Sequence, residues 1–144
     1  MRFRGGATVG DCVELTDDAL EMSWAIQDDA SKRGFDWPDI SGVFAKVREE
    51  IAEVESAWVS GDVDSARREL GDLLFATVNL ARFLRAAPDE ELERANRRFN
   101  KRFALLDKEL RRLGREMEQC TLAELDEVWE RIKEQAPSSV VSDG

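Results

Sequence analysis

The chain has 144 residues, with 31 acidic and 21 basic side chains, a formal net charge of −10, and no histidine or tyrosine. This length favours a single domain. The lack of histidine excludes Ser-His-Asp and Cys-His catalysis, histidine-ligated zinc and Glu-x-x-His di-iron sites. Because acid exceeds base, we expect no nucleic-acid partner.

The cysteine content and the hydropathy pattern bear on location. Cys12 and Cys120 lie far apart, which favours reduced thiols in a cytoplasmic protein. The first ten residues lack the apolar core of a secretory signal. The longest apolar stretch, 70–84, contains an aspartate, an asparagine and an arginine and is too short to span a membrane. We therefore expect no membrane partner.

Hydrophobic spacing by threes and fours dominates the chain, and no useful two-residue alternation is present, so we predict an all-α fold of about five helices. Helix-ending glycines and a Thr121–Glu124 capping box help to bound them. The predicted helices cover 16–33, 40–60, 62 or 64 to 86, 87–113 and 121–135.

The helices are expected to form one bundle. We predict an N-terminal extension at 1–13, a helical domain at 14–136 and a flexible tail at 137–144. With 42% apolar and 36% charged residues, the chain has enough apolar surface for a core but little to spare. We therefore expect a core like that of a four-helix bundle, completed by dimerisation.

Two acidic groups stand out. Lys46, Glu49, Glu50 and Glu53 form one stripe beside the apolar stripe of their helix, although a solvated glutamate-rich face has the same pattern. The segment 69–84 is apolar nearly all round. It nevertheless carries Glu69 and Asp72 on one face, with Asn79 near that face two turns further on. A structural salt bridge to Arg67, Arg68 or Arg82 is the alternative explanation for the two acids.

Antiparallel packing of the two helices would bring Glu50 and Glu53 opposite Glu69 and Asp72. Four carboxylates at close range would not all ionise at neutral pH without a cation. All-oxygen ligands favour Mg²⁺, with Mn²⁺ as a possible substitute, and magnesium commonly shares its ligand shell with substrate phosphates. The pattern predicts phosphoryl or nucleotidyl chemistry by metal-activated water.

Glu49-Glu50-x-x-Glu53, followed by Glu69-x-x-Asp72, resembles the signature of the all-α nucleoside triphosphate pyrophosphohydrolases, specifically the MazG family. The resemblance covers about residues 24 to 133 and is to the C-terminal of the two domains in long MazG proteins, here expected as a single-domain form. Four local strings support it: Gly-Phe-Asp-Trp at 34–37, the run 69–82, Ala-Asn-x-x-Phe at 95–99 and Arg-Phe at 102–103.

The resemblance implies a Mg²⁺-dependent enzyme that hydrolyses nucleoside triphosphates between the α and β phosphates, releasing monophosphate and pyrophosphate. It also implies a homodimer and a role in cleaning the nucleotide pool. By that similarity Glu50, Glu53, Glu69 and Asp72 are metal ligands, and Glu49 positions or deprotonates the attacking water.

Further side chains are candidates for holding the nucleotide. The phosphate candidates are Lys46, Arg98 and Arg102, the two arginines forming an i, i+4 pair. The base or ribose candidates are Trp37, Asn79 and Trp129, for which core packing or backbone hydrogen bonding is the alternative.

Two other functions stay open. A narrow-specificity all-α hydrolase, acting on dUTP, dCTP or phosphoribosyl-ATP, would use the same carboxylates. A non-catalytic acidic helical dimerisation module would not need them.

Overall fold

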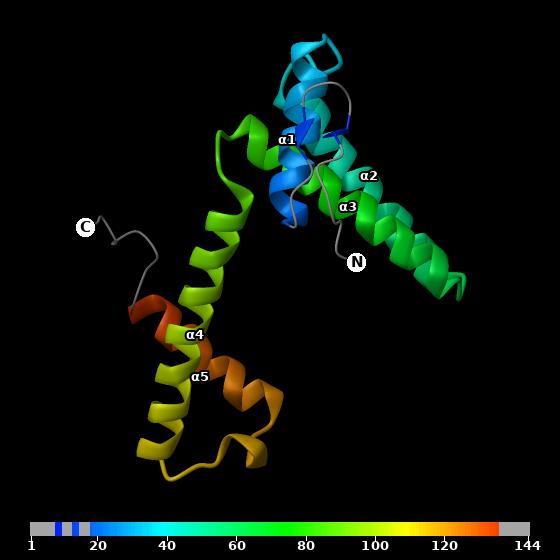
Figure 1. Ribbon diagram of the computed structural model, residues 1–144. Coiled ribbons are helices and arrows are strands. Elements are labelled where there is room, and N and C mark those ends of the chain that lie inside the picture. The colour runs from blue at the N-terminus through cyan, green and yellow to red at the C-terminus, as the bar shows by residue number, and fades with distance from the viewer. Residues whose placement is uncertain (1–7, 10–12, 15–17, 136–144) are drawn as a thin grey trace, which may run out of the picture. The chain divides into compact units, whose positions relative to one another are not determined.

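The computed structural model describes residues 8–9, 13–14 and 18–135, and these confirm the all-α prediction (Figure 1). Two short strands, β1 (Thr8–Val9) and β2 (Val13–Glu14), pair antiparallel. The helices are α1 (Ala19–Lys32), α2 (Ile40–Val59), α3 (Val63–Phe83), α4 (Pro88–Arg112) and α5 (Leu122–Gln135), with a 3₁₀ turn, η1, at Met117–Gln119. The predicted helix start at Thr16 lies outside the described residues.

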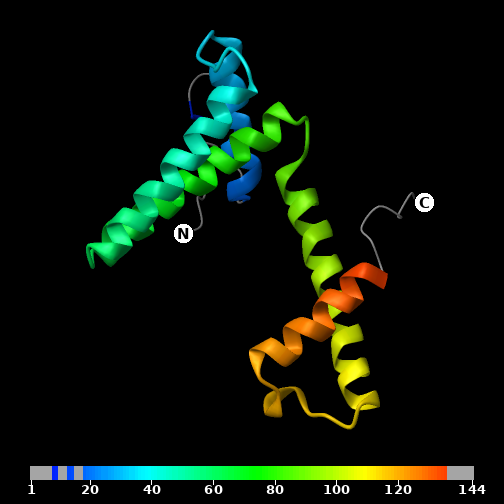
Figure 2. The same ribbon diagram turned by 180° about the vertical axis from the view of Figure 1, so that it is seen from behind.

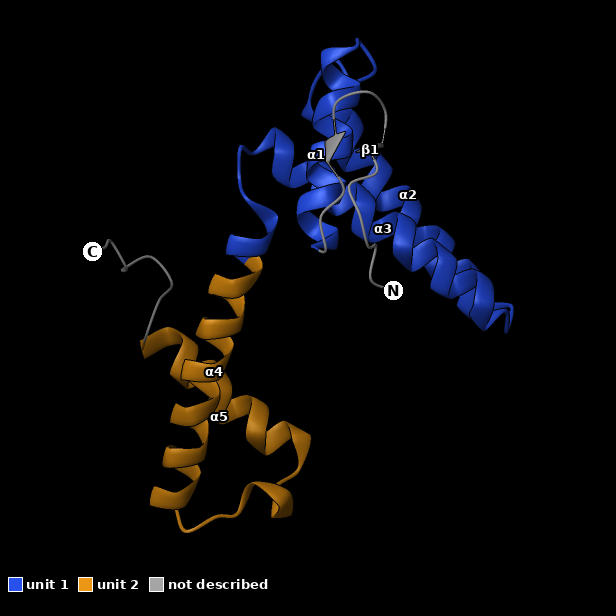
Figure 3. Cartoon of the chain, in the orientation of Figure 1, with its two compact units in different colours: residues 1–91 blue, residues 92–144 orange. Residues whose placement is uncertain are grey.

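The chain divides into two compact units, Met1–Glu91 and Leu92–Gly144 (Figure 3). In the first unit α2 and α3 lie side by side as an antiparallel hairpin, and α1 packs against α3 (Figures 1 and 2). Its buried apolar side chains are Val43, Ala66, Ala76 and Val78. The limits predicted for the extension, the domain and the tail stay predictions, and 137–144 lies outside the described residues.

The second unit has a small core of its own between α4 and α5. Leu106 and Leu110 from α4 meet Val128 and Ile132 from α5, and Trp129 packs against this cluster. None of the described helices has the length and hydropathy required to cross a membrane.

Side-chain caps explain where the helices begin. The Oδ1 atoms of Asp18, Asp39 and Asp62 accept hydrogen bonds from backbone N–H groups in the first turns of α1, α2 and α3. At α5 the predicted capping box is confirmed. Thr121 Oγ1 accepts from the backbone N–H of Glu124 at 3.2 Å, and Glu124 Oε2 accepts from that of Thr121 at 2.9 Å.

The ends of the helices share one geometry. Gly34, Gly61 and Gly114 adopt φ values of 89°, 79° and 70° directly after the last turns of α1, α2 and α4. Arg85 does the same after α3 with φ 56°, and the N–H of Ala86 donates to the Ala81 carbonyl at 2.9 Å. The predicted end of this helix at Ala86 is therefore wrong by three residues, because an arginine occupies a position where glycine is the usual signal.

We predict that Arg85→Gly stabilises the protein by about 0.5 to 1 kcal/mol, because relief of the left-handed strain exceeds the added unfolded-state entropy. Gly61→Ala is the matched opposite change, since no atom lies within 4 Å of an added Cβ and strain alone remains. It is expected to cost about 1 kcal/mol. Urea titration followed by circular dichroism measures both, and a loss of stability in Arg85→Gly would contradict the prediction.

Candidate functional site

Three carboxylates from the facing sides of α2 and α3 gather at one place. One oxygen each from Glu50, Glu69 and Asp72 lie within 4.8 Å of one another. This is the juxtaposition that antiparallel pairing of the two helices predicts. Glu53, the fourth predicted member, is outside this group of three but close enough to it for Glu69 and Glu50 to raise its pKa.

Glu50 lies at the centre of this cluster and is only 3% exposed. Its Oε1 is 2.7 Å from the Lys46 ammonium, one turn earlier on α2. Its Oε2 is buried and has no hydrogen-bond partner among the residues that the structure describes. A buried carboxylate oxygen without a partner is costly, so this atom calls for a donor or a cation that the described residues do not supply.

The titration behaviour of the neighbours reflects the crowding of negative charge. A hydrogen bond to Glu69, followed by partial desolvation and the charges of Glu50, Glu69 and Glu49, raises the pKa of Glu53. The hydrogen bond to Glu50 is the main cause that raises the pKa of Lys46. The Lys46 ammonium, which lies beside both Glu50 and Glu49, offsets part of this repulsion.

Among the described residues, Glu69 and Asp72 do not form the alternative salt bridges to Arg67, Arg68 or Arg82. Arg67 pairs with Asp64 at 3.2 Å, Arg68 donates to Ser65 Oγ at 2.7 Å, and Arg82 pairs with Asp36 at 2.5 Å. These three arginines thus have other partners. Oxygen donors in a partly buried cluster with an orphaned atom fit a hard divalent cation, so the cluster could hold a metal ion.

A pocket of about 740 Å³ opens beside the cluster within the first unit. Lys46, Glu50 and Asp72 line one part of it. The rest is lined by apolar side chains of α1, of α3 and of the loop between α1 and α2, by the polar side chains of Gln27, Asp36 and Arg82, and by Trp37 and Asn79, two of the predicted base-binding residues. The indole of Trp37 lies against the first turn of α2. A Cβ on Gly42 would come within 2.5 Å of its ring, so glycine is what permits this packing.

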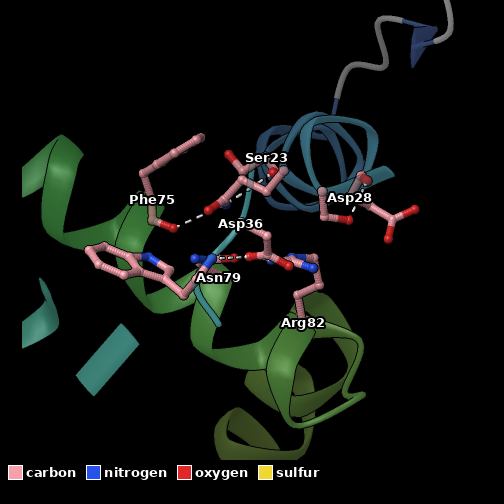
Figure 4. A network of polar contacts seen from close by, with 9 residues as sticks. Ser23, Asp28, Asp36, Phe75, Asn79 and Arg82 are labelled. Atoms are coloured by element: carbon pink, nitrogen blue, oxygen red, sulfur yellow. Dashed lines mark hydrogen bonds and ion pairs between the residues drawn. The ribbon is translucent and has the colours of Figure 1, made fainter. Parts of the chain in front are cut away.

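A polar network that the sequence did not predict organises the same pocket (Figure 4). Arg82 donates from Nε to Asn79 Oδ1 at 3.0 Å and from its terminal nitrogen to Asp36 Oδ1. That aspartate oxygen also accepts the backbone N–H of Trp37 at 2.8 Å. From α1, Gln27 Nε2 donates to the carbonyls of Ser23 and Phe75.

Two of these contacts, Arg82–Asp36 and Gln27–Phe75, join residues 46 and 48 positions apart, which no periodicity connects, so the sequence did not predict them. The signals available in the sequence were two polar residues within otherwise apolar helical segments, Gln27 and Arg82.

Four further predicted residues are outside the three-carboxylate cluster: Glu49, Arg98, Arg102 and Trp129. Glu49 is more exposed than Glu50 and has its Oε1 3.5 Å from Lys46 Nζ. Arg98, Arg102 and Trp129 belong to the second unit, so their contribution to the site stays a prediction. The Trp129 ring contacts Phe99 at a centroid distance of 5.5 Å, which agrees with the packing alternative.

Comparison with known proteins identifies the family. Residues 40–104 match the model of the MazG nucleotide pyrophosphohydrolase domain. The chain is 41% identical over 115 residues to the nucleoside triphosphate pyrophosphohydrolase/pyrophosphatase MazG of Thermotoga maritima, covering 80% of this chain and 44% of that protein. It is 40% identical over 119 residues to the nucleoside triphosphate pyrophosphohydrolase of Escherichia coli K12, covering 81% and 45%.

The chain thus spans about half the length of the curated relatives that it matches. The matched segment 40–104 contains the four clustered acids as well as Lys46 and Asn79. The chain therefore carries a MazG nucleotide pyrophosphohydrolase domain.

Proposed function

We propose that this protein is a Mg²⁺-dependent nucleoside triphosphate pyrophosphohydrolase. Water attacks the triphosphate, the bond between the α and β phosphates breaks, and nucleoside monophosphate and pyrophosphate leave. The observation that carries the proposal is the orphaned Oε2 of Glu50 within a cluster of three carboxylates beside a pocket. The names of the two relatives agree with this reaction class.

The residues that would hold the metal are Glu50, Glu69 and Asp72, with Glu53, one turn after Glu50 on α2, as the fourth proposed ligand. Magnesium prefers carboxylate oxygens and substrate phosphates, and Mn²⁺ accepts the same ligands. When bound, such an ion neutralises phosphate charge and lowers the pKa of water.

The chain's own residues then supply position and charge. Glu49 directly precedes Glu50 on α2, and its side chain is far more exposed. Its carboxylate is therefore suited to orient the attacking water and to accept its proton. Lys46 holds Glu50 in place and offers an ammonium to a phosphate, because it also lines the pocket. Arg98 and Arg102, on successive turns of α4, are the further phosphate candidates that the family resemblance suggests.

Trp37 and Asn79 line the pocket and are the proposed contacts to the base or ribose, with Trp129 as the third candidate. Stacking on an indole suits every nucleobase, which is consistent with a broad substrate range and a role in cleaning the nucleotide pool. A cytoplasmic location belongs to the same proposal.

A homodimer is part of the proposal because large apolar side chains are exposed along α2 and α3. Trp58 is 66% exposed, Val59 78% and Leu74 53%. Exposed apolar surface of this kind commonly marks a protein interface. A second copy of the chain would cover it and enlarge the small core of the first unit.

The first prediction that follows from this proposal concerns the reaction. With Mg²⁺ the protein should release pyrophosphate from ribo- and deoxyribonucleoside triphosphates, and Glu53→Gln should lower kcat/KM roughly a hundredfold by removing a charge from the metal cluster. Glu55→Gln, at an exposed position of the same helix, is the matched control and should keep full activity.

The outcomes of this assay separate the candidate functions. Failure to hydrolyse any triphosphate, or full activity in Glu53→Gln, would refute the proposed enzyme. Hydrolysis of a single pyrimidine nucleotide, with no turnover of any purine triphosphate, would favour a narrow-specificity hydrolase. Binding of neither Mg²⁺ nor nucleotide, together with a specific protein partner, would favour a non-catalytic helical module.

The second prediction concerns the metal. Binding to the native state alone raises stability, by about 2.7 kcal/mol when the ligand is at a hundred times its Kd. Saturating Mg²⁺ or Mn²⁺ should therefore raise the melting temperature of the wild-type protein, and Glu50→Gln should abolish most of this shift. An equal metal-dependent shift in Glu50→Gln would show that the ion binds elsewhere.

The third prediction concerns assembly. Sedimentation equilibrium should give a mass of about twice the 16.3 kDa of one chain. Leu74→Glu should shift the protein towards the monomer, because it buries a charge in the proposed interface. A single-chain mass for the wild-type protein across the micromolar range would contradict the dimer.

A further inference from the structure

Two amide side chains in the pocket have fixed and opposite hydrogen-bonding polarity. The first is Gln27 on α1, which is 9% exposed. Its Nε2 donates to the carbonyl oxygens of Ser23 at 3.1 Å and Phe75 at 3.2 Å. Carbonyl oxygens only accept, so both amide hydrogens are used and the side chain cannot be flipped. The group that remains for a ligand is Oε1, which is an acceptor.

The second amide is Asn79, one helical turn after Phe75 on the same face of α3. Its Oδ1 accepts from Arg82 Nε at 3.0 Å. A guanidinium can only donate, so the oxygen must face Arg82. The group that remains for a ligand is Nδ2, which is a donor.

Arg82 and Asp36 hold this arrangement in place. The Arg82 side chain is 11% exposed, and its terminal nitrogen lies 2.5 Å from Asp36 Oδ1. The same oxygen accepts the backbone N–H of Trp37, so the pair ties the loop before α2 to α3. Figure 4 shows Asn79 and Arg82 projecting from α3 towards Asp36.

We propose that Gln27 and Asn79 read the hydrogen-bonding edge of a nucleobase, with Gln27 accepting and Asn79 donating, and that Arg82 and Asp36 are positioning residues for Asn79. The proposal rests on the proposed function and deepens it. It assigns Gln27 a role in specificity and gives Asn79 a defined polarity.

A donor and an acceptor in fixed places distinguish two classes of base. Oxo bases such as uracil and hypoxanthine present a carbonyl next to a ring N–H. Amino bases such as cytosine and adenine present an amino group next to a ring nitrogen lone pair. The order of donor and acceptor is reversed between the classes, so a base of the wrong class leaves the amides facing like groups. Leaving such polar groups unpaired weakens binding by roughly ten- to a hundredfold.

The test uses nucleoside monophosphates, which the proposed reaction does not consume. Calorimetry gives the dissociation constants of UMP against CMP and of IMP against AMP, each pair differing at the edge in question. Asn79→Asp is the informative variant, because its carboxylate can still accept from Arg82 while the group facing the pocket changes from donor to acceptor. Gln27→Met removes the other reading group, and Gln119→Glu, at an exposed position, controls for added negative charge.

We expect the wild-type protein to favour one class, and Asn79→Asp to change the oxo-to-amino ratio about tenfold or more. Gln27→Met should bring that ratio towards one, and Gln119→Glu should leave it unchanged. Equal ratios in the wild-type protein and both pocket variants, or no binding of any monophosphate, would overturn the proposal. Pyrophosphate release is measured separately, so failure of base reading and failure of the proposed hydrolysis are distinguishable.

Discussion

The buried carboxylate of Glu50 is the constraint on which the first unit depends. One of its oxygens is neutralised by Lys46 on its own helix, and the other lies buried without a partner. Facing it from α3 are two further acids, Glu69 and Asp72. Burying a charge next to other charges opposes folding, so the apolar contacts of the α2–α3 hairpin must outweigh this repulsion. A site that only served stability would not place these groups together.

Helix α3 carries both halves of the candidate site along one face. Asp72 and Asn79 are seven residues apart, so they lie about 10 Å apart along the helix axis and on nearly the same side. That spacing separates a carboxylate end, suited to a cation and phosphates, from an amide end, suited to a base. Gln27 joins the amide end through the Phe75 carbonyl, which lies between these two positions on α3. Helix α3 thereby sets the distance between the carboxylate end and the amide end of the candidate site.

The sequence was informative where interactions are local or periodic. Spacing by threes and fours predicted the helices, and it predicted that the acids of α2 face those of α3. It failed at Arg85, where an arginine adopts a left-handed conformation without a glycine to indicate it. It also failed for the Arg82–Asp36 and Gln27–Phe75 contacts, because these depend on the meeting of distant segments. The orphaned Glu50 oxygen could not be predicted either, since it depends on which neighbours fail to reach it.

The division of the candidate metal ligands between two helices would give metal binding a structural consequence. Glu50 belongs to α2, whereas Glu69 and Asp72 belong to α3, so their mutual repulsion acts across the interface that forms the first unit. A cation held by all three would convert this repulsion into attraction between the same two helices. Gln27 joins α1 to α3, and Arg82 joins α3 to Asp36 in the loop before α2. The amide end of the candidate site therefore also depends on the position of α3. Tightening the α2–α3 pair would therefore also make the base-reading groups more rigid.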